Sequence, residues 1–124
     1  MAAFWTPKSR TVGQTLLNHH RSTCGSLKPE EPISDATVSS YILTYEGLRR
    51  MAGIGGIAQG MGPHLRKIAD WCNLHGFPPL HALVVRNKEG DPGDGYRRCA
   101  ATSGDWRLDV RECIAFRGYP TDLR

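Results

Sequence analysis

Three segments decide the fold: residues 44–53 read T-Y-E-G-L-R-R-M-A-G, residues 57–72 read I-A-Q-G-M-G-P-H-L-R-K-I-A-D-W-C, and residues 78–96 read P-P-L-H-A-L-V-V-R-N-K-E-G-D-P-G-D-G-Y. We interpret them in order as a short helix, a longer helix and a β-wing. Two helices at an angle followed by a wing are the build of a DNA-binding module. The sequence therefore predicts a small α+β, winged-helix-like domain with three to four helices and a β-hairpin wing.

The short helix has clear start and stop signals. Thr44 is a suitable cap, Leu48 and Met51 are expected to turn inward, and Gly53 is expected to end the helix. The glycine-rich residues 53–57 resemble a phosphate-cradling loop, but they lack the Lys-Ser/Thr pair of a P-loop. A tight turn between helices is therefore the favoured interpretation.

The longer helix is predicted over residues 57–75. Pro63 is tolerated only near a first turn, so the helix is expected to start close to Gly62 or to bend there. One apolar stripe runs along the helix and consists of Ile57, Met61, Leu65, Ile68 and Cys72. Polar residues lie away from the stripe, namely Gln59, Arg66, Lys67 and Asn73.

The wing begins with a predicted strand over residues 80–86. Residues 87–95 then form a turn rich in residue types that accept positive φ, and residues 96–101 are expected to pair back. Together with the two helices, this unit covers residues 44–96.

The flanking segments predict further elements of one domain over residues 1–124. Residues 1–10 form a tail whose Phe4 and Trp5 are expected to dock on the core, and residues 35–42 form a short strand or an extended arm. Residues 11–25 contain a first helix that Thr11 caps and Gly25 ends. Its apolar face consists of Val12, Leu16, Leu17 and His20.

The C-terminal element is placed at residues 103–117. Ser103 is a candidate cap for a helix, and a strand over residues 113–116 is the alternative. Residues at helical spacing are Trp106, Val110, Cys113 and Ile114. The tail over residues 118–124 is expected to be loose.

Charge favours a polyanionic partner. Sixteen Lys and Arg against 12 Asp and Glu give a net charge of +4, and neutralising phosphates with such cations releases counterions. A basic protein without such a partner is the alternative.

Cysteine and histidine spacing predicts no metal and no cofactor. None of the four cysteines forms a C-x-x-C pair, and the neighbours His19 and His20 point about 100° apart on a helix. We expect buried, inert thiols. No apolar run is long enough for a bilayer and no signal peptide opens the chain, so we expect a cytoplasmic protein without a membrane partner.

Residues 43–96 resemble the DNA-binding domain of alkylguanine-DNA alkyltransferases and alkyltransferase-like proteins. The family's T-Y-x-x-L-x-x-x-x-G is matched by Thr44, Tyr45, Leu48 and Gly53. Its A-R-A-V-G-x-x-L corresponds in part to Ala58, Gln59, Gly60, Met61, Gly62 and Leu65. Its P-C-H-R-V-V-R, glycine turn and G-Y correspond in part to Val84, Val85, Arg86, Gly90, Gly93, Gly95 and Tyr96.

The resemblance implies a groove-binding scaffold without alkyl transfer. His81 stands where the family has its nucleophilic cysteine, and Gln59 stands where it has the arginine that fills the gap of a flipped base. Tyr45 is retained, and the family uses that tyrosine against the phosphate beside the flipped nucleotide. A P-P-L-x-x-L-V-V-x-x-x-x-G-x-P-G-x-G-Y segment is also similar to one in an uncharacterised group of small bacterial and phage proteins.

Three functions follow as hypotheses. The first is a non-enzymatic module that binds double-stranded DNA. The second is a small phage or mobile-element protein that binds and inhibits or adapts a bacterial defence complex, and the third is a catalyst acting through His81. One continuous basic face would favour DNA, whereas an exposed apolar patch would favour a protein partner. The predicted DNA contacts are Tyr45, Arg49, Gln59, Pro63, Arg66, Lys67, Arg86 and Lys88.

Overall fold

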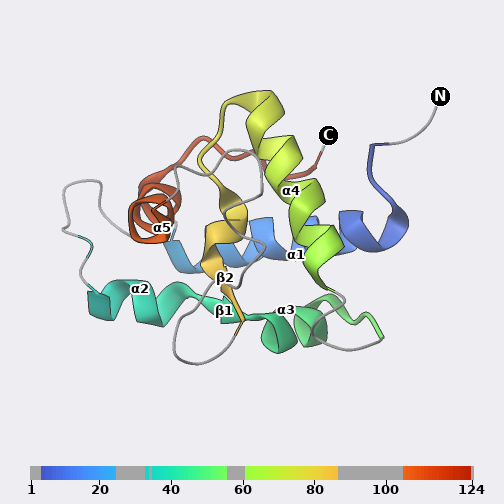
Figure 1. Cartoon of the computed structure of the whole chain (residues 1–124), viewed down its shortest axis with the longest axis horizontal. Coiled ribbons are helices and arrows are strands. Elements are labelled where there is room, and N and C mark those ends of the chain that lie inside the picture. Colours follow the sequence, from blue (N-terminus) through green and yellow to red (C-terminus); the bar gives the residue numbers. More distant parts are fainter. Residues whose placement is uncertain (1–3, 25–32, 34, 56–60, 87–104, 124) are drawn as a thin grey trace.

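A computed structural model of the chain describes residues 4–24, 33, 35–55, 61–86 and 105–123. Helices dominate these ranges, and two short strands form a parallel sheet, as expected of a small α+β domain. In chain order (Figure 1) the elements are α1 (Pro7–Cys24), α2 (Asp35–Tyr41), β1 (Leu43–Thr44), α3 (Tyr45–Ala52), α4 (Gly62–His75), the 3₁₀ helix η2 (Leu80–Leu83), β2 (Val84–Val85) and α5 (Trp106–Ala115). The described ranges thus hold five α-helices, where three to four were expected. None of the five is both long and apolar enough to cross a bilayer.

Helix α1 is the central support of the fold. It packs against α4 and α3, and also against α2, α5 and η2; Figure 1 shows it running through the middle of the molecule. Its predicted apolar face is confirmed, because Val12, Leu16, Leu17 and His20 are all buried. The helix begins at Pro7, earlier than expected. Its cap is Thr6 instead of Thr11, because the Thr6 hydroxyl accepts a hydrogen bond from the Ser9 amide.

Trp5 docks on this support, as predicted. Its side chain is buried, and its ring lies 6.2 Å from that of Trp71 on α4. Phe4, by contrast, is exposed.

The prediction of a strand or arm over residues 35–42 was wrong, because residues 35–41 form α2. The turn continues one residue further, where the Ile42 amide donates to the Val38 carbonyl. Val38 is buried, and α2 packs on α5 and α1. Burial of one side against two helices therefore outweighs the strand preference of β-branched residues.

The prediction of a strand over residues 80–86 was wrong for its first half. Residues 80–83 form η2, which starts after Pro79 with a bond from the Ala82 amide to the Pro79 carbonyl. Only Val84 and Val85 are extended, and β2 pairs in parallel with β1. Both valines are buried, so this apolar run reflects a strand covered on both faces. The predicted wing turn and its returning strand, residues 87–101, lie outside the described ranges, whereas Arg86 just before them is described.

The start and stop of α3 are as predicted. The Thr44 hydroxyl accepts from the Gly47 amide, and Gly53 takes the left-handed conformation with φ 69°. Leu48 is buried, but Met51 is 51% exposed, so its inward orientation was predicted wrongly. Ala52 packs against the core instead, because it follows Leu48 at a spacing of four residues and so lies on the same face of the helix.

The start of α4 near Gly62 is confirmed, with Pro63 in its first turn. Gly76 ends the helix at φ 70° and donates to the carbonyls of Cys72 and Asn73. Buried residues of the predicted stripe are Met61, Leu65, Ile68 and Cys72, and Ile57 lies outside the described ranges.

The C-terminal element is a helix, α5, rather than the alternative strand. Asp105 caps it through the Arg107 amide, and Ser103 lies outside the described ranges. Val110, Cys113 and Ile114 are buried as predicted.

The tail after α5 is packed, so its predicted looseness was wrong. Leu123 is 2% exposed, and its amide donates to Gln14 Oε1 on α1 at 3.1 Å. The Tyr119 hydroxyl donates to the Pro78 carbonyl at 2.6 Å. Burial of Leu123 and packing of Tyr119 against the core hold this short segment in place.

Candidate nucleic-acid interface

The parallel strands bring two predicted contact residues to one place. Leu43 pairs with Val84 and Thr44 with Val85, and β2 also contacts α3. Tyr45 and Arg86 are the next residues of the two strands, so they leave the sheet at the same end. Tyr45 is half-buried and packs on the core, while Arg86 is exposed.

Glu46 holds both arginines of α3. Its carboxylate pairs with Arg49 three residues on and with Arg50 four residues on. These bonds, led by the one from Arg49, lower the pKa of Glu46 to about 2. Arg49 also donates to the Ile54 carbonyl at 2.9 Å. Arg49 therefore holds the turn after α3, and its side chain is only 20% exposed.

The outer face of α4 carries predicted DNA-contact residues that take no part in the ion pairs of Glu46 on α3. Pro63 and Arg66 are exposed, and Lys67 is half-buried with its ammonium 4.8 Å from the centre of the Phe4 ring. No ion pair within the described ranges involves Arg66 or Lys67, although Asp70 follows within one turn. These two charges are therefore available to an external anion.

The predicted DNA contacts leave out two exposed cations, one of which lies close to α4. Ser9 and the His64 Nδ1 atom are hydrogen-bonded at 2.8 Å, which ties the start of α1 to the start of α4. Burial first, and then the charge of Lys8, lower the pKa of His64. Lys8 is exposed, and it lies near the α4 N-terminus because its neighbour Ser9 bonds to His64. The sequence had assigned Lys8 to a tail. Arg50 of α3, with its side chain 77% exposed, is the other cation that was not among the predicted DNA contacts.

His81 lies in the core, on η2. It is 2% exposed, and burial lowers its pKa to about 4, against a smaller opposing effect of the buried Asp109. The imidazole is therefore neutral near pH 7. A group that acts on DNA must reach a substrate, and this side chain is covered by protein.

Three cysteines are buried as predicted. Cys24, Cys72 and Cys113 are free thiols, and burial raises the pKa of each, that of Cys72 to about 12. Cys99 lies outside the described ranges. In the part of the chain that the structure describes, no three His, Cys, Asp or Glu side chains are grouped so that they could hold a metal ion. Buried protonated thiols are poor nucleophiles.

The structure brings some of the predicted contact residues together, and two others lie outside the residues that it describes. Tyr45 and Arg86 directly follow the two paired strands at the same end of the sheet, and Pro63, Arg66 and Lys67 share the first two turns of α4. Gln59 and Lys88 lie outside the described ranges.

Comparisons of the chain with known protein families, with curated proteins and with solved structures gave no match. The resemblance to alkyltransferase DNA-binding domains thus stays a prediction. What the chain does must be argued from its own geometry.

Proposed function

We propose that this chain is a non-enzymatic, winged-helix-like protein that binds double-stranded DNA. The outer face of α4 is the principal contact surface. The residues at the end of the β1–β2 pair, Tyr45 and Arg86, contact the flanking phosphates. The predicted wing, residues 87–95, completes the interface in this proposal.

One observation carries the proposal: Arg66 and Lys67 stand next to each other on the surface of α4 without an ion pair among the described residues. Most cations that bind phosphate gain affinity by releasing counterions from DNA. An internal carboxylate would reduce that gain. The first turn of α4, with Pro63 and the nearby Lys8, supports the same use, because helix N-termini favour anions.

The α3 arginines take a smaller part in the proposed contact than the sequence suggested. Arg49 is held by Glu46 and by the Ile54 carbonyl. Arg50 shares the same carboxylate but is far more exposed. We therefore assign the α3 phosphate contact to Arg50, and Arg49 keeps the turn in place.

The proposal assigns no reaction to the chain. Burial of His81 and of the three described thiols supports this choice, because these are the side chains that the sequence offered for nucleophilic or acid–base chemistry. A protein partner is a weaker candidate. Among the described residues, the large exposed apolar side chains are Phe4, which precedes α1, and Met51, Leu74 and Leu108, which belong to three different helices.

A matched pair of variants tests the proposal. Arg66→Ala and Arg107→Ala each remove one cation from an exposed helical position, the first on α4 and the second on α5. Fluorescence anisotropy with a labelled duplex at about 50 mM salt should show a several-fold loss of affinity for Arg66→Ala only. Equal losses would mean a diffuse charge effect. No binding by the parent would favour a protein partner.

A further inference from the structure

A series of hydrogen bonds joins the start of α1 to His64 on α4. The Thr6 hydroxyl donates to Ser9 Oγ at 2.8 Å, and the Ser9 amide donates to the Thr6 hydroxyl oxygen at 3.1 Å. Ser9 Oγ in turn lies 2.8 Å from His64 Nδ1, although the two residues are 55 positions apart in the chain. Ser9 is only 3% exposed, so water competes little for its hydroxyl group. The imidazole of His64 is therefore held at one of its two nitrogens.

These bonds also fix which ring nitrogen of His64 carries the proton. Thr6 donates to Ser9 Oγ, so the hydroxyl proton of Ser9 is left for the bond to His64 Nδ1. A nitrogen that accepts a hydrogen bond holds its lone pair, and the proton of the neutral ring then sits on Nε2. His64 is thus a hydrogen-bond donor at Nε2.

The Nε2 atom of His64 reaches the surface. Within the part of the chain that the structure describes, this atom has no hydrogen-bond partner, and it is not one of the buried polar atoms that lack a partner. The residue as a whole is half-buried. A ring that is held at Nδ1 and uncovered at Nε2 offers an oriented donor to an external acceptor.

The charges near His64 favour an anionic acceptor. Burial lowers the pKa of His64 most strongly, and the positive charge of the exposed Lys8 on α1 lowers it further. Lys67 follows His64 at a spacing of three on α4, so the two side chains lie on one side of the helix. The other element that packs closely on α4 is η2, and among the described residues neither η2 nor any carboxylate acts on the pKa of His64.

We propose that His64 donates a hydrogen bond from Nε2 to a phosphate of the bound DNA and that Ser9 positions it for this contact. This inference rests on the proposed function, in which Arg66 and Lys67 of the same helix contact phosphates. A cation attracts a phosphate from any direction, whereas an N–H group bonds well only along its own axis. His64 therefore adds orientation to a contact that the two cations hold by charge.

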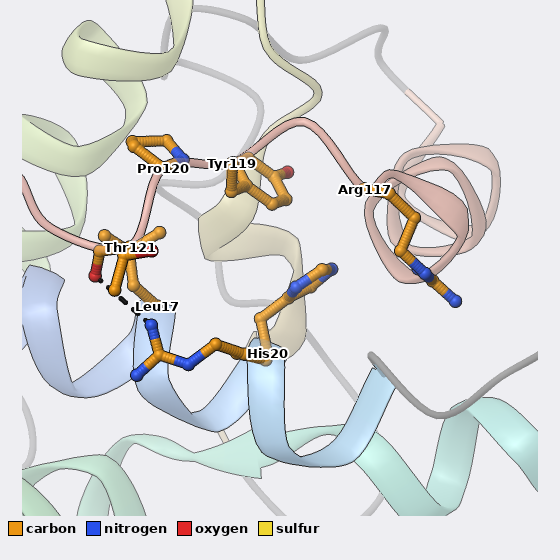
Figure 2. Close-up of a pocket in the computed structure, with 7 residues that line it drawn as sticks. Leu17, His20, Arg117, Tyr119, Pro120 and Thr121 are labelled. Atoms are coloured by element: carbon orange, nitrogen blue, oxygen red, sulfur yellow. Dashed lines mark hydrogen bonds between the residues drawn. The ribbon is translucent and has the colours of Figure 1, made fainter.

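His20 is an internal control for this inference. Its Nε2 atom lies 2.7 Å from the Cys113 carbonyl oxygen, which only accepts, so the proton is again on Nε2 but is already bonded within the protein. Figure 2 shows the ring facing Tyr119 in a pocket of about 170 Å³ between α1 and the tail after α5. Residues 9 and 20 are eleven positions apart on α1, which is about 16 Å along the helix. A contact at His64 should leave His20 unaffected.

The test records proton–nitrogen NMR spectra of the imidazole rings at about pH 7.5, first for the free parent and then with a saturating short duplex at about 50 mM salt. Free His64 should be protonated at Nε2. On binding, its Nε2 signal should shift and its N–H proton should exchange more slowly with water, while the His20 signals stay in place. A duplex that binds without changing the His64 signals, or a free His64 ring protonated at Nδ1, would overturn the inference.

Variants separate this inference from the proposed function. His64→Ala should weaken duplex binding by about threefold to tenfold, the usual worth of one hydrogen bond. If Arg66→Ala weakens binding but His64→Ala does not, only the inference about His64 fails. If the parent does not bind duplex DNA, both fail.

Ser9→Ala tests the positioning role. Without the Ser9 hydroxyl, the His64 ring should populate both neutral tautomers in the same spectra, and duplex affinity should fall. Ser22→Ala removes a hydroxyl from an exposed position of α1 and should change neither the tautomer nor the affinity. A His64 ring that stays protonated at Nε2 in Ser9→Ala would contradict the role of Ser9.

The pH profile of binding provides a readout that a purely structural role would not move. A phosphate at Nε2 stabilises the charged imidazolium, so the pKa of His64 should rise in the complex and the parent should bind DNA more tightly as the pH falls from about 7.5 to about 6. His64→Gln keeps an N–H donor but takes up no proton, so it should lose most of this gain. Equal gains in the parent and in His64→Gln would contradict the contact.

Discussion

Thr44 lies opposite Val85 in the parallel pair of β1 and β2, although 41 positions separate them in the chain. This pairing joins the start of α3 to the end of the buried apolar run after η2. Tyr45 and Arg86 therefore follow the two strands at the same end of the sheet. Two candidate contact residues from distant parts of the sequence thus share one end of the sheet.

Gly53 should be the less replaceable of two neighbouring glycines. Its φ of 69° is a conformation that side chains with a Cβ disfavour, whereas no such φ applies at Gly55, and a Cβ at either position would meet no atom. Gly53→Ala should lower the free energy of unfolding by about 1 kcal/mol, measured by urea titration. Gly55→Ala is the control. Equal effects would show that the left-handed cap does not matter for stability.

The packed tail gives a second matched pair. Leu123 is 2% exposed and Leu108 is 55% exposed. Leu123→Ala should lower the free energy of unfolding by about 2 kcal/mol, because it leaves a gap against α1. Leu108→Ala should change it by less than about 0.5 kcal/mol. A tail that is loose in solution would make the two variants alike.

Sequence patterns predicted the helices well where several signals agreed. Val12, Leu16, Leu17 and His20 follow a helical period and are all buried. Thr44 and Gly53 mark both ends of α3 through their own side-chain and backbone chemistry. Local signals of this kind depend on neighbours in the chain, so they can be read without the fold.

The sequence was less informative where distant contacts decide the structure. Val38 sits in a helix because α5 and α1 cover it, and Val84 pairs with Leu43, which lies 41 positions earlier in the chain. The engagement of Arg49 by Glu46 is local, and a spacing of three on a helix could have revealed it. The pocket beside His20 depends on a tail that the sequence did not mark as ordered.

His81 should make the protein sensitive to acid. Its pKa is lowered to about 4 in the fold and is near 6.5 in an unfolded chain. Between these values the unfolded state binds more protons, so stability falls as the pH drops through this window, by up to about 1.4 kcal/mol per pH unit. Unfolding in urea at several pH values measures this slope.

His81→Gln should flatten that slope, whatever its effect on absolute stability. A residual slope is expected from His20 and His64, because burial also lowers the pKa of each. If the parent and His81→Gln show the same slope between pH 4 and pH 6.5, the buried neutral histidine is not the cause.

Glu46 limits the positive charge that α3 presents. Glu46→Gln removes the partner of Arg49 and Arg50 and should strengthen duplex binding, roughly two- to tenfold at low salt. Glu112→Gln makes the same charge change at an exposed position on α5 and is the control. If the two variants gain the same affinity for the duplex in anisotropy titrations, α3 is not part of the interface.

The central claim is that Arg66 and Lys67 contact DNA phosphates. The most direct test is the salt dependence of duplex binding by the parent and by Arg66→Ala/Lys67→Ala, measured by anisotropy from about 50 to about 200 mM salt. Each lost phosphate contact reduces the slope of log affinity against log salt by about 0.9, so the double variant should bind more weakly with a slope reduced by about 2. The melting temperature should stay nearly the same, because Arg66 is exposed and the half-buried Lys67 contacts the ring of the exposed Phe4 rather than the core. Parallel lines of equal affinity, or a parent that does not bind duplex DNA, would contradict the account.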